Sequence, residues 1–434
     1  MVFFSVIGFH AFAENGYKLW LRYVKVSDAA LGNTYKMTLK QVVFPGRSLT
    51  LQAARKELDL GLSGMLGITP AIVNTTKADG TLLVGTPGSL PDLNMPSVHD
   101  VLKTIGDEGY IIKSVIVKGK QCTVIAANTD VGVVYEVFNF LKLIQTHQNL
   151  QHLAIAEQPK IKHRVLDHWD NLDGTIERGY AGYTLWDWQR LPGYIDQRYE
   201  EYARANASIG INGTVLNNVN AKAKSLTRDY IIKTAALANV FRKYGIRVYL
   251  TARFTAPMEL GKLKTADPLD PEVKKWWKDK ADEIYTYIPD FGGFLVKANS
   301  EGQPGPQDYG RTHADGVNLL AEALAPHGGM VMWRAFVYAN YKDADRAKQA
   351  YEEFKPPDGK FEPNVMLQVK NGPIDFQPRE VQHPLFGAMP KTPITLEFEI
   401  TQEYLGYATH LVYLAPCLRN AWNLILTQRV KDLR

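Results

Sequence analysis

The stretch GGFLVKANSEGQPGP, Gly292–Pro306, decides how we interpret the rest of the chain. Its apolar run, Phe294–Val296, predicts a buried strand, and its Gly/Pro-rich end can neither continue a strand nor start a helix. Lys297, Asn299 and Glu301 stand between the two. In a parallel α/β barrel the loop after a strand's carboxyl end carries the chemistry, so we interpret this corner as part of an active site. The alternative interpretation is a solvated loop glutamate beside an ordinary strand-end lysine.

The same order of strand, loop and helix repeats on both sides of this stretch. The runs typical of strands are His163–Trp169, Gly213–Val219, Ile246–Phe254, Gly292–Asn299, Gly328–Phe336, Asn364–Asn371 and Ile394–Thr401. Helical patterns between them cover Thr227–Tyr244, the segment that starts at Asp270-Pro271-Glu272, Arg311–Pro326 and Ala344–Phe354. This alternation predicts an α/β fold with a parallel sheet, and its length favours a (β/α)8 TIM barrel. Seven strands are found instead of eight, so we expect the barrel to be incomplete.

The residues before the barrel predict a separate, small α+β domain. Ile111–Lys118 and Gln121–Ala126 are β-branched runs that predict a hairpin, with Gly119-Lys120 as its two-residue turn. Asp130 is expected to cap the amphipathic helix that follows. An extended run is expected over Tyr17–Val26. The expected domains are therefore a signal segment over 1–13, an α+β domain over 14–157, the barrel over 158–416 and a divergent tail over 417–434.

The first 13 residues, MVFFSVIGFHAFA, resemble a secretory signal. They are apolar and end in the small-residue pattern Ala11-Phe12-Ala13, although the usual positive start is missing. This predicts a secreted or periplasmic protein, against a membrane-proximal segment or a wrongly assigned start. No later run reaches about 18 apolar residues, so no membrane span is expected.

Composition argues against several other classes of function. The net charge of +5 is spread over 50 basic and 45 acidic residues without a long block of one sign, which argues against nucleic acid as a partner. Cys122 and Cys417 are too few for a disulfide framework or a thiolate metal site. The 10 histidines form no HExxH motif, and neither a dinucleotide fingerprint nor a phosphate loop is present. We therefore expect no metal and no cofactor.

Polar and aromatic side chains follow the predicted strands at their carboxyl ends. They are Trp169, Val219 with its neighbouring asparagines, Lys297, Glu301, Arg334, Lys370, Asp375 and Glu403. This set suits a sugar site, because flat rings stack on pyranoses and a pair of carboxyl groups can cleave a glycosidic bond. The three cations on the same rim indicate an anionic sugar, which charge-assisted hydrogen bonds would recognise.

Each of these residues also has a structural interpretation. Asp375 follows Gly372-Pro373 and fits a turn, and Glu403 fits the positive end of a following helix. Trp169 and Trp333 fit core positions as well as sugar platforms. Arg334 fits a structural ion pair. The functional interpretation rests on the joint occurrence of these residues at the same end of successive strands.

Four motifs then suggest a family. VKANSEGQPGP (Val296–Pro306), KNGPIDFQPRE (Lys370–Glu380) and LEFEITQEYLG (Leu396–Gly406), with DHWDN (Asp167–Asn171) ahead of them, closely resemble the α-glucuronidases of glycoside hydrolase family sixty-seven. The resemblance extends from about Glu14 to Pro416.

The resemblance implies a role for each residue on the rim. Glu301 matches the general acid, and Asp375 and Glu403 match the two acids that activate the attacking water of an inverting hydrolysis. Lys297, Arg334 and Lys370 match the residues of a uronate clamp. Trp169 and Val219 match the wall of the pocket. The implied substrate is 4-O-methyl-D-glucuronic acid linked α-1,2 to a xylooligosaccharide, with no cofactor or metal. A general acid must be protonated, so we expect a raised pKa for Glu301.

The chain departs from the family pattern after Ala415-Pro416. Family members continue into the rest of the barrel and a helical C-terminal domain with dimer contacts, so a homodimer is expected only where that domain is present. Two other functions stay open: a non-catalytic carbohydrate-binding remnant, and a barrel glycosidase of the hexosaminidase type. The rim cations argue against the second.

Overall fold

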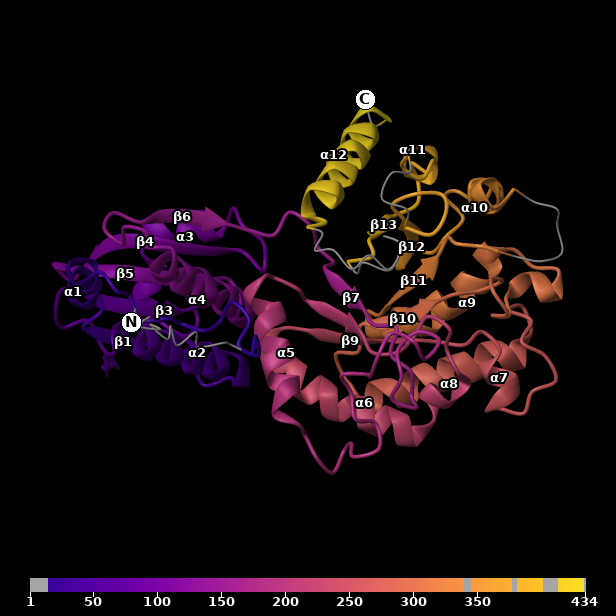
Figure 1. Cartoon of the computed structure of the whole chain (residues 1–434), viewed down its shortest axis with the longest axis horizontal. Coiled ribbons are helices and arrows are strands. Elements are labelled where there is room, and N and C mark those ends of the chain that lie inside the picture. Colours follow the sequence, from indigo (N-terminus) through magenta and orange to yellow (C-terminus); the bar gives the residue numbers. More distant parts are fainter. Residues whose placement is uncertain (1–14, 339–344, 377–380, 401–412, 433–434) are drawn as a thin grey trace, which may run out of the picture. The chain divides into compact units, whose positions relative to one another are not determined.

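A computed structural model describes residues 15–338, 345–376, 381–400 and 413–432 of the chain. The signal-like segment over residues 1–13 lies outside the described residues. The chain divides into two compact units. The first comprises residues 1–162 with 200–211 and 243–245, and the second comprises the rest. Figure 1 labels the helices and strands of both units.

The N-terminal unit is built on a mixed sheet with the strand order β2-β1-β3-β5-β4-β6. Its strands are β1 Gln41–Val43, β2 Ala71–Ile72, β3 Thr81–Gly85, β4 Tyr110–Val117, β5 Lys120–Ala127 and β6 Ala154–Glu157. Its helices are α1 Ala29–Thr38, α2 Leu49–Leu66, α3 Pro96–Leu102 and α4 Asp130–Gln145, with a short 3-10 helix, η1 Pro91–Asn94. The predicted α+β content is therefore present.

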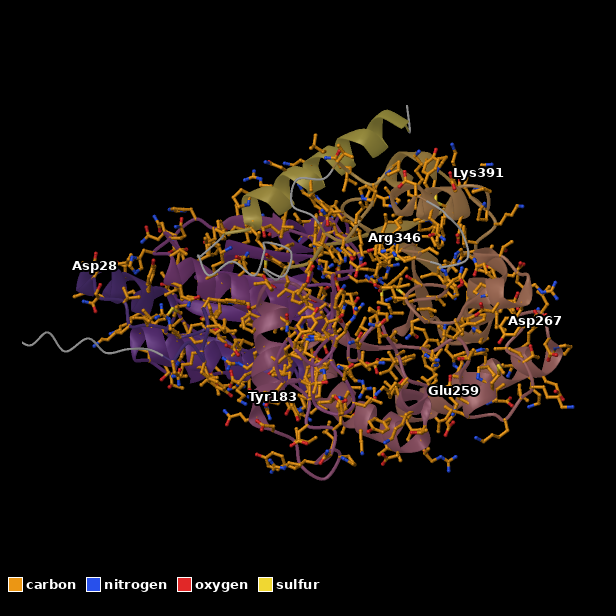
Figure 2. All side chains as sticks on the ribbon, turned by 45° about the vertical axis from the view of Figure 1, so that its right-hand side comes forward. Asp28, Tyr183, Glu259, Asp267, Arg346 and Lys391 are labelled. Carbon is orange, nitrogen blue, oxygen red and sulfur yellow. The ribbon has the colours of Figure 1, made fainter. Side chains whose placement is uncertain are left out.

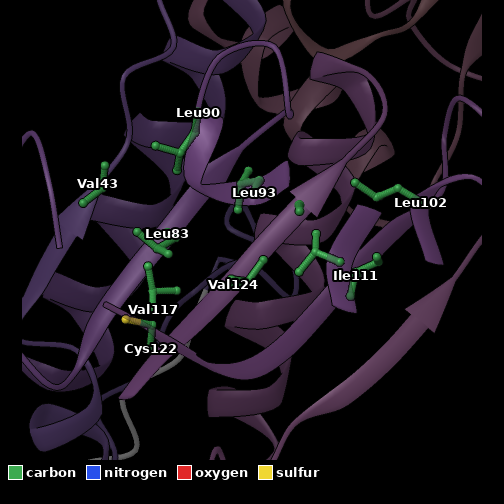
Figure 3. Packing of buried hydrophobic residues seen from close by; sticks show 11 residues of the cluster. Val43, Leu83, Leu90, Leu93, Leu102, Ile111, Val117, Cys122 and Val124 are labelled. Atoms are coloured by element: carbon green, nitrogen blue, oxygen red, sulfur yellow. The ribbon is translucent and has the colours of Figure 1, made fainter. Parts of the chain in front are cut away.

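Alternation along β5 gives this sheet two apolar faces. Cys122, Val124 and Ala126 pack with Leu93 of η1 and Leu102 of α3 in one buried cluster, which Figure 3 shows. The opposite face meets α4, against which α2 packs. Successive side chains of a strand point to opposite faces, so a nearly continuous apolar run is what a sheet covered on both sides requires.

Three local predictions for this unit were wrong in detail. The hairpin turn is Lys118-Gly119, not Gly119-Lys120, because Val117 pairs with Lys120 and both turn residues have positive φ, +51° and +77°. The cap of α4 is Thr129, whose hydroxyl accepts a hydrogen bond from the Gly132 amide. No strand forms over Tyr17–Val26, which is a turn followed by irregular chain.

The second unit contains the seven predicted strands in one sheet with the order β13-β12-β11-β10-β9-β8-β7. Every neighbouring pair is parallel. The strands are β7 Val165–Asp167, β8 Gly213–Val215, β9 Arg247–Thr251, β10 Gly293–Val296, β11 Met330–Arg334, β12 Val365–Lys370 and β13 Ile394–Glu397. Each is shorter than its predicted run, because the run includes loop residues at the carboxyl end.

The remaining helices follow the first barrel strand in sequence; residues 200–208 of the first of them belong to the N-terminal unit, and the last of them comes after β13. They are α5 Gln197–Ser208, α6 Arg228–Phe241, α7 Ala256–Glu259, α8 Pro271–Tyr287, α9 His313–Leu324, α10 Arg346–Phe354, α11 Leu385–Ala388 and α12 Ala415–Asp432. Short 3-10 helices occur at η2 Ala223–Leu226, η3 Arg242–Tyr244, η4 Pro306–Tyr309 and η5 Ala325–His327. Asp270 caps α8 as predicted, and its carboxylate accepts from the amides of Glu272 and Val273. Pro271 takes the first helical position, where its missing N–H costs nothing.

The sheet curls until its first and sixth strands meet. The Gln368 amide of β12 donates to Asp167 Oδ2 of β7 at 3.3 Å, although these strands are far apart in the order of the sheet. Val215, Leu295 and Met332, from three different strands, pack in one buried cluster inside the curl. The sheet is therefore most of a (β/α)8 barrel, with β13 and β7 as its two edges.

Gly293 at the start of β10 provides a test of this close strand packing. Its φ is +131°, and a Cβ there would lie 1.9 Å from the Met330 carbonyl oxygen of β11. Gly293→Ala is expected to destabilise the protein by about 3 kcal/mol, because left-handed strain and a backbone clash add. Urea unfolding measures the loss. Gly328→Ala is the matched control, because Gly328 also has a positive φ, +72°, but faces open space. Equal losses in both variants would contradict this account of β10.

Candidate active site

The site lies along the edge formed by the carboxyl ends of the barrel strands. Asp167, Arg334, Lys370 and Glu397 are the last residues of β7, β11, β12 and β13, and Lys297 follows β10 directly. Because all seven strands are parallel, these residues share one edge of the sheet. Trp169 and Val219 belong to the loops after β7 and β8 and pack on the same buried cluster. The structure thus places Lys297, Arg334 and Lys370 along one end of the barrel, with Trp169 and Val219 in the loops beside them.

Glu301 lies on the loop after β10 between two cations. Lys297 Nζ donates to Glu301 Oε2 at 2.5 Å and to Asn220 Oδ1 at 2.8 Å. Arg178, from the loop after β7, donates through Nη2 to Glu301 Oε1 at 3.2 Å. Lys297 is buried, whereas the Glu301 side chain is 30% exposed. The carboxylate can thus meet a solute while it is held from two sides.

The backbone of this loop is strained where it presents Glu301. Asn299 and Glu301 have φ values of +56° and +49°, a region that L-residues with a side chain rarely occupy. Ser300 and Gln303 pair across the turn, and Arg253 Nη1 donates to Gln303 Oε1 at 3.2 Å. Strain of about 1–3 kcal/mol per residue persists only where surrounding contacts impose it, and it is frequent at functional sites.

The charge state of Glu301 differs from the sequence-based expectation. Burial by itself would raise its pKa, but the hydrogen bond and charge of Lys297, with the charges of Arg178 and Lys370, outweigh burial and hold the pKa below its usual value. The expectation of a raised pKa was therefore wrong for the free protein. The physical reason is that sequence spacing does not reveal how many cations surround a carboxylate.

Arg334 forms a buried, bidentate salt bridge with Glu397. Its Nη2 and Nε donate to the two carboxylate oxygens at 2.9 and 3.2 Å. Both side chains are buried, and the guanidinium also lies over the Trp169 ring at 5.7 Å. Arg334 therefore takes part in the ion pair that its structural interpretation describes, at the same edge as the other site residues.

Lys370 forms the third pair of the edge, with Asp375. Its ammonium donates to Asp375 Oδ1 and lies 3.1 Å from the Phe336 ring centre and 4.4 Å from that of Phe376. Burial, followed by the nearby charge of Arg334, lowers the pKa of Lys370 to about 8. Aromatic faces stabilise a cation that has little water around it. Asp375 is thus held by Lys370 and is more than a residue of a local turn.

Asp167 is a buried acid beneath these pairs. Its carboxylate accepts from the Gln368 amide. Burial raises its pKa, and the negative charge of Glu397 raises it further, while Arg334 opposes both. The surroundings of Asp167 therefore favour its protonated form.

The two tryptophans separate into different environments. Trp169 is partly exposed, and its ring centre lies 6.4 Å from that of Phe376, tilted by 53°. Trp333 is fully buried, and its indole N–H donates to His313 Nδ1 at 3.1 Å. Trp169 is thus available as a sugar platform, whereas Trp333 belongs to the core. Glu403 lies outside the described residues.

Within the residues that the structure describes, no cluster of three or more His, Cys, Asp or Glu side chains has the arrangement of a metal site. Among the same residues, no helix is long and apolar enough to cross a membrane.

Comparison with known protein families decides the membership of the chain. Residues 19–140 match the model of the glycosyl hydrolase family 67 N-terminus, and residues 143–432 match that of the family 67 middle domain. The chain belongs to glycosyl hydrolase family 67.

Three curated relatives of this family 67 chain are named as alpha-glucuronidases or probable alpha-glucuronidases. "Probable alpha-glucuronidase A" of Neosartorya fischeri is 41% identical over 97% of this chain and 50% of its own length. "Alpha-glucuronidase A" of Emericella nidulans is 38% identical over 99% of this chain and 52% of its own length. "Alpha-glucuronidase" of Hypocrea jecorina is 40% identical over 93% of this chain and 49% of its own length. The chain thus spans about half the length of the curated relatives it matches. A solved GH138 enzyme targeting pectin rhamnogalacturonan II superposes with a TM-score of 0.48 at 15% identity, covering 81% of this chain and 41% of that chain, which is too weak to carry an argument.

Two charged residues that contact the other residues of this edge were not selected from the sequence. Glu397 ends β13, so the rule that selected Lys370 and Arg334 would also have selected it, but Glu403 was chosen for that strand instead. Arg178 lies in a loop of the sequence GTIERGYAG with no pattern that points to the barrel edge. Only the fold brings it to Glu301.

Proposed function

We propose that this family 67 chain carries an α-glucuronidase site, which hydrolyses the α-1,2 bond between (4-O-methyl-)D-glucuronic acid and a xylooligosaccharide. The observation that carries the proposal is the row of three cation and carboxylate pairs along one strand edge: Lys297 with Glu301, Arg334 with Glu397, and Lys370 with Asp375. Such a row offers both cations for a uronate and carboxyl groups for glycosidic cleavage. Curated relatives with the name alpha-glucuronidase support the same substrate class.

Glu301 is the proposed general acid. Its carboxyl group is partly exposed on a constrained loop, so it can reach the oxygen of the leaving xylose while Lys297 fixes its position. Proton donation to that oxygen lets the glycosidic bond break as positive charge develops on the sugar ring. Glu301 must gain a proton before this step, because its pKa is low in the free site.

Asp375 is proposed, together with Glu403, to activate the attacking water. The Lys370 ammonium orients the Asp375 carboxylate, and the lysine is itself fixed between Phe336 and Phe376. Attack by water on the face opposite the leaving group inverts the anomeric carbon. The partly exposed ring of Trp169 and the side chain of Val219 are proposed as the walls against which the sugar lies.

The test is incubation of this chain with aldotetraouronic acid while proton NMR follows the first anomer released. We expect the β-anomer of 4-O-methylglucuronic acid, because inversion of an α-bond gives a β-product. Xylotetraose, which lacks the acid, is the matched control and should stay intact. Release of the α-anomer would overturn the inverting mechanism. Binding without release would instead identify a carbohydrate-binding module.

A further inference from the structure

The charges at the barrel edge are already balanced before any substrate arrives. Lys297, Arg334 and Lys370 each contact a carboxylate, at Glu301, Glu397 and Asp375 respectively. A uronate would add a negative charge to this balanced set. In a partly buried site such a charge is costly unless a cation changes partner or a carboxylate takes up a proton.

Among the cations at this edge, Arg178 can change its carboxylate partner at the lowest cost in free energy. The Arg334 pair is double and buried, and Lys297 and Lys370 are themselves buried. The Arg178 side chain is 61% exposed, and exposed ion pairs contribute little to stability. Its Nε also lies 3.3 Å from Glu177 Oε1, so it keeps a carboxylate neighbour when it leaves Glu301.

The backbone that carries Arg178 is held in place beside the barrel edge. The carbonyl of Glu177 accepts from the side-chain amides of Asn171 at 2.7 Å and Asn218 at 3.1 Å. The amide of Glu177 donates to the Trp169 carbonyl at 2.8 Å. Arg178 can therefore reorient its side chain from a fixed base, within reach of both Glu301 and a sugar beside Trp169.

We propose that Arg178 is a positioning residue for Glu301, and that a bound uronate draws Arg178 away so that Glu301 takes up a proton as the substrate binds. The proton comes from solvent and forms one O–H bond on the Glu301 carboxylate, with no change of oxidation state. This inference rests on the proposed function, because it assumes that a uronate occupies the site. It explains how an acid that is ionised in the free site becomes the proton donor in the complex.

The direction of the effect follows from the groups that face Glu301. They are Lys297 after β10, Arg178 from the loop after β7, and Lys370 at the end of β12, and all three lower its pKa. Loss of Arg178 from the carboxylate and arrival of a second anion both raise that pKa. Binding therefore takes up a proton at a pH between the free and the bound pKa, and takes up none well below or above both.

The experiment is isothermal titration calorimetry of this chain with sodium D-glucuronate, in two buffers that differ in ionisation enthalpy, over a series of pH values. We expect uptake of about one proton per uronate bound at the maximum of the pH series. Glu301→Gln should bind without uptake. Arg178→Gln should reach its maximum at a higher pH, because its free Glu301 already has a raised pKa, whereas Arg178→Lys keeps the charge and should resemble the unchanged chain.

Asp167→Asn tests whether Asp167, instead of Glu301, takes up the proton. Uptake that persists in Asp167→Asn and disappears in Glu301→Gln supports the proposal. Uptake that survives in Glu301→Gln, or binding without any uptake in the unchanged chain, overturns it. Absence of glucuronate binding in a chain with an intact circular dichroism spectrum overturns the proposed function itself. Arg178 is exposed, so its variants are expected to fold, and thermal unfolding checks this for all four variants.

Discussion

Replacing Glu301 with Gln is expected to lower the release of 4-O-methylglucuronic acid from aldotetraouronic acid by about 10²–10⁴-fold, the usual contribution of a general acid. Gln has nearly the same shape as Glu and can still accept a hydrogen bond from Lys297, but its amide cannot donate a proton to the leaving oxygen. We therefore expect kcat to fall while the variant still binds the substrate. Steady-state kinetics of product release, with calorimetric binding beside it, separates the two.

The matched control for this variant is Glu272→Gln in the first turn of α8. Glu272 is exposed and lies outside the barrel edge, so the same chemical change there should leave turnover unaltered. Turnover by Glu301→Gln at the rate of the unchanged chain would remove Glu301 from the reaction and, with it, the proposed division of labour.

Replacing Glu397 with Leu is expected to destabilise the protein by about 3–5 kcal/mol, because it leaves the buried Arg334 guanidinium without its double salt bridge. Asp167 offsets part of this loss. The Glu397 charge contributes to the raised pKa of Asp167, so its removal lets Asp167 ionise and attract Arg334. Urea unfolding gives the free energy directly.

The double variant Glu397→Leu with Arg334→Met tests the cause of that loss. Removal of both charges leaves no unpaired guanidinium, so we expect most of the stability to return. Asp167 stays protonated in this variant, because burial raises its pKa. A double variant as unstable as the sum of the two single variants would mean that the pair contributes through packing and not through its charge.

The barrel was predictable because its signal is local. Runs such as Phe294–Val296 are apolar, short and followed by loop residues, and seven of them in alternation with helices define a parallel sheet before any contact is known. The caps were less predictable. Thr129 and Asp130 are adjacent and both suit a cap, and only the geometry of the backbone decides between them. The run Tyr17–Val26 has strand-like residues but finds no neighbouring strand to pair with.

The sequence indicated which cations stand at the strand ends and did not indicate their partners. Lys297, Arg334 and Lys370 were selected because each ends a strand, which a sequence displays. Their partners were not, because Arg334 and Glu397 lie 63 residues apart and Arg178 and Glu301 lie 123 apart. The expected direction of the Glu301 pKa shift was wrong for the same reason, because that pKa depends on which cations the fold places around the carboxylate. The catalytic role of Glu403 stays a prediction.

The hydrogen bond between Gln368 and Asp167 joins residues that lie 201 positions apart. Closing so long a loop costs conformational entropy before the hydrogen bond can stabilise the fold. Contacts between residues so far apart in sequence form late and slowly. On a ribosome this contact can form only after the sixth barrel strand has been synthesised, although β7 can pair with β8 before that. The closing of the curled sheet at the mouth of the barrel is therefore expected to be a late step of folding.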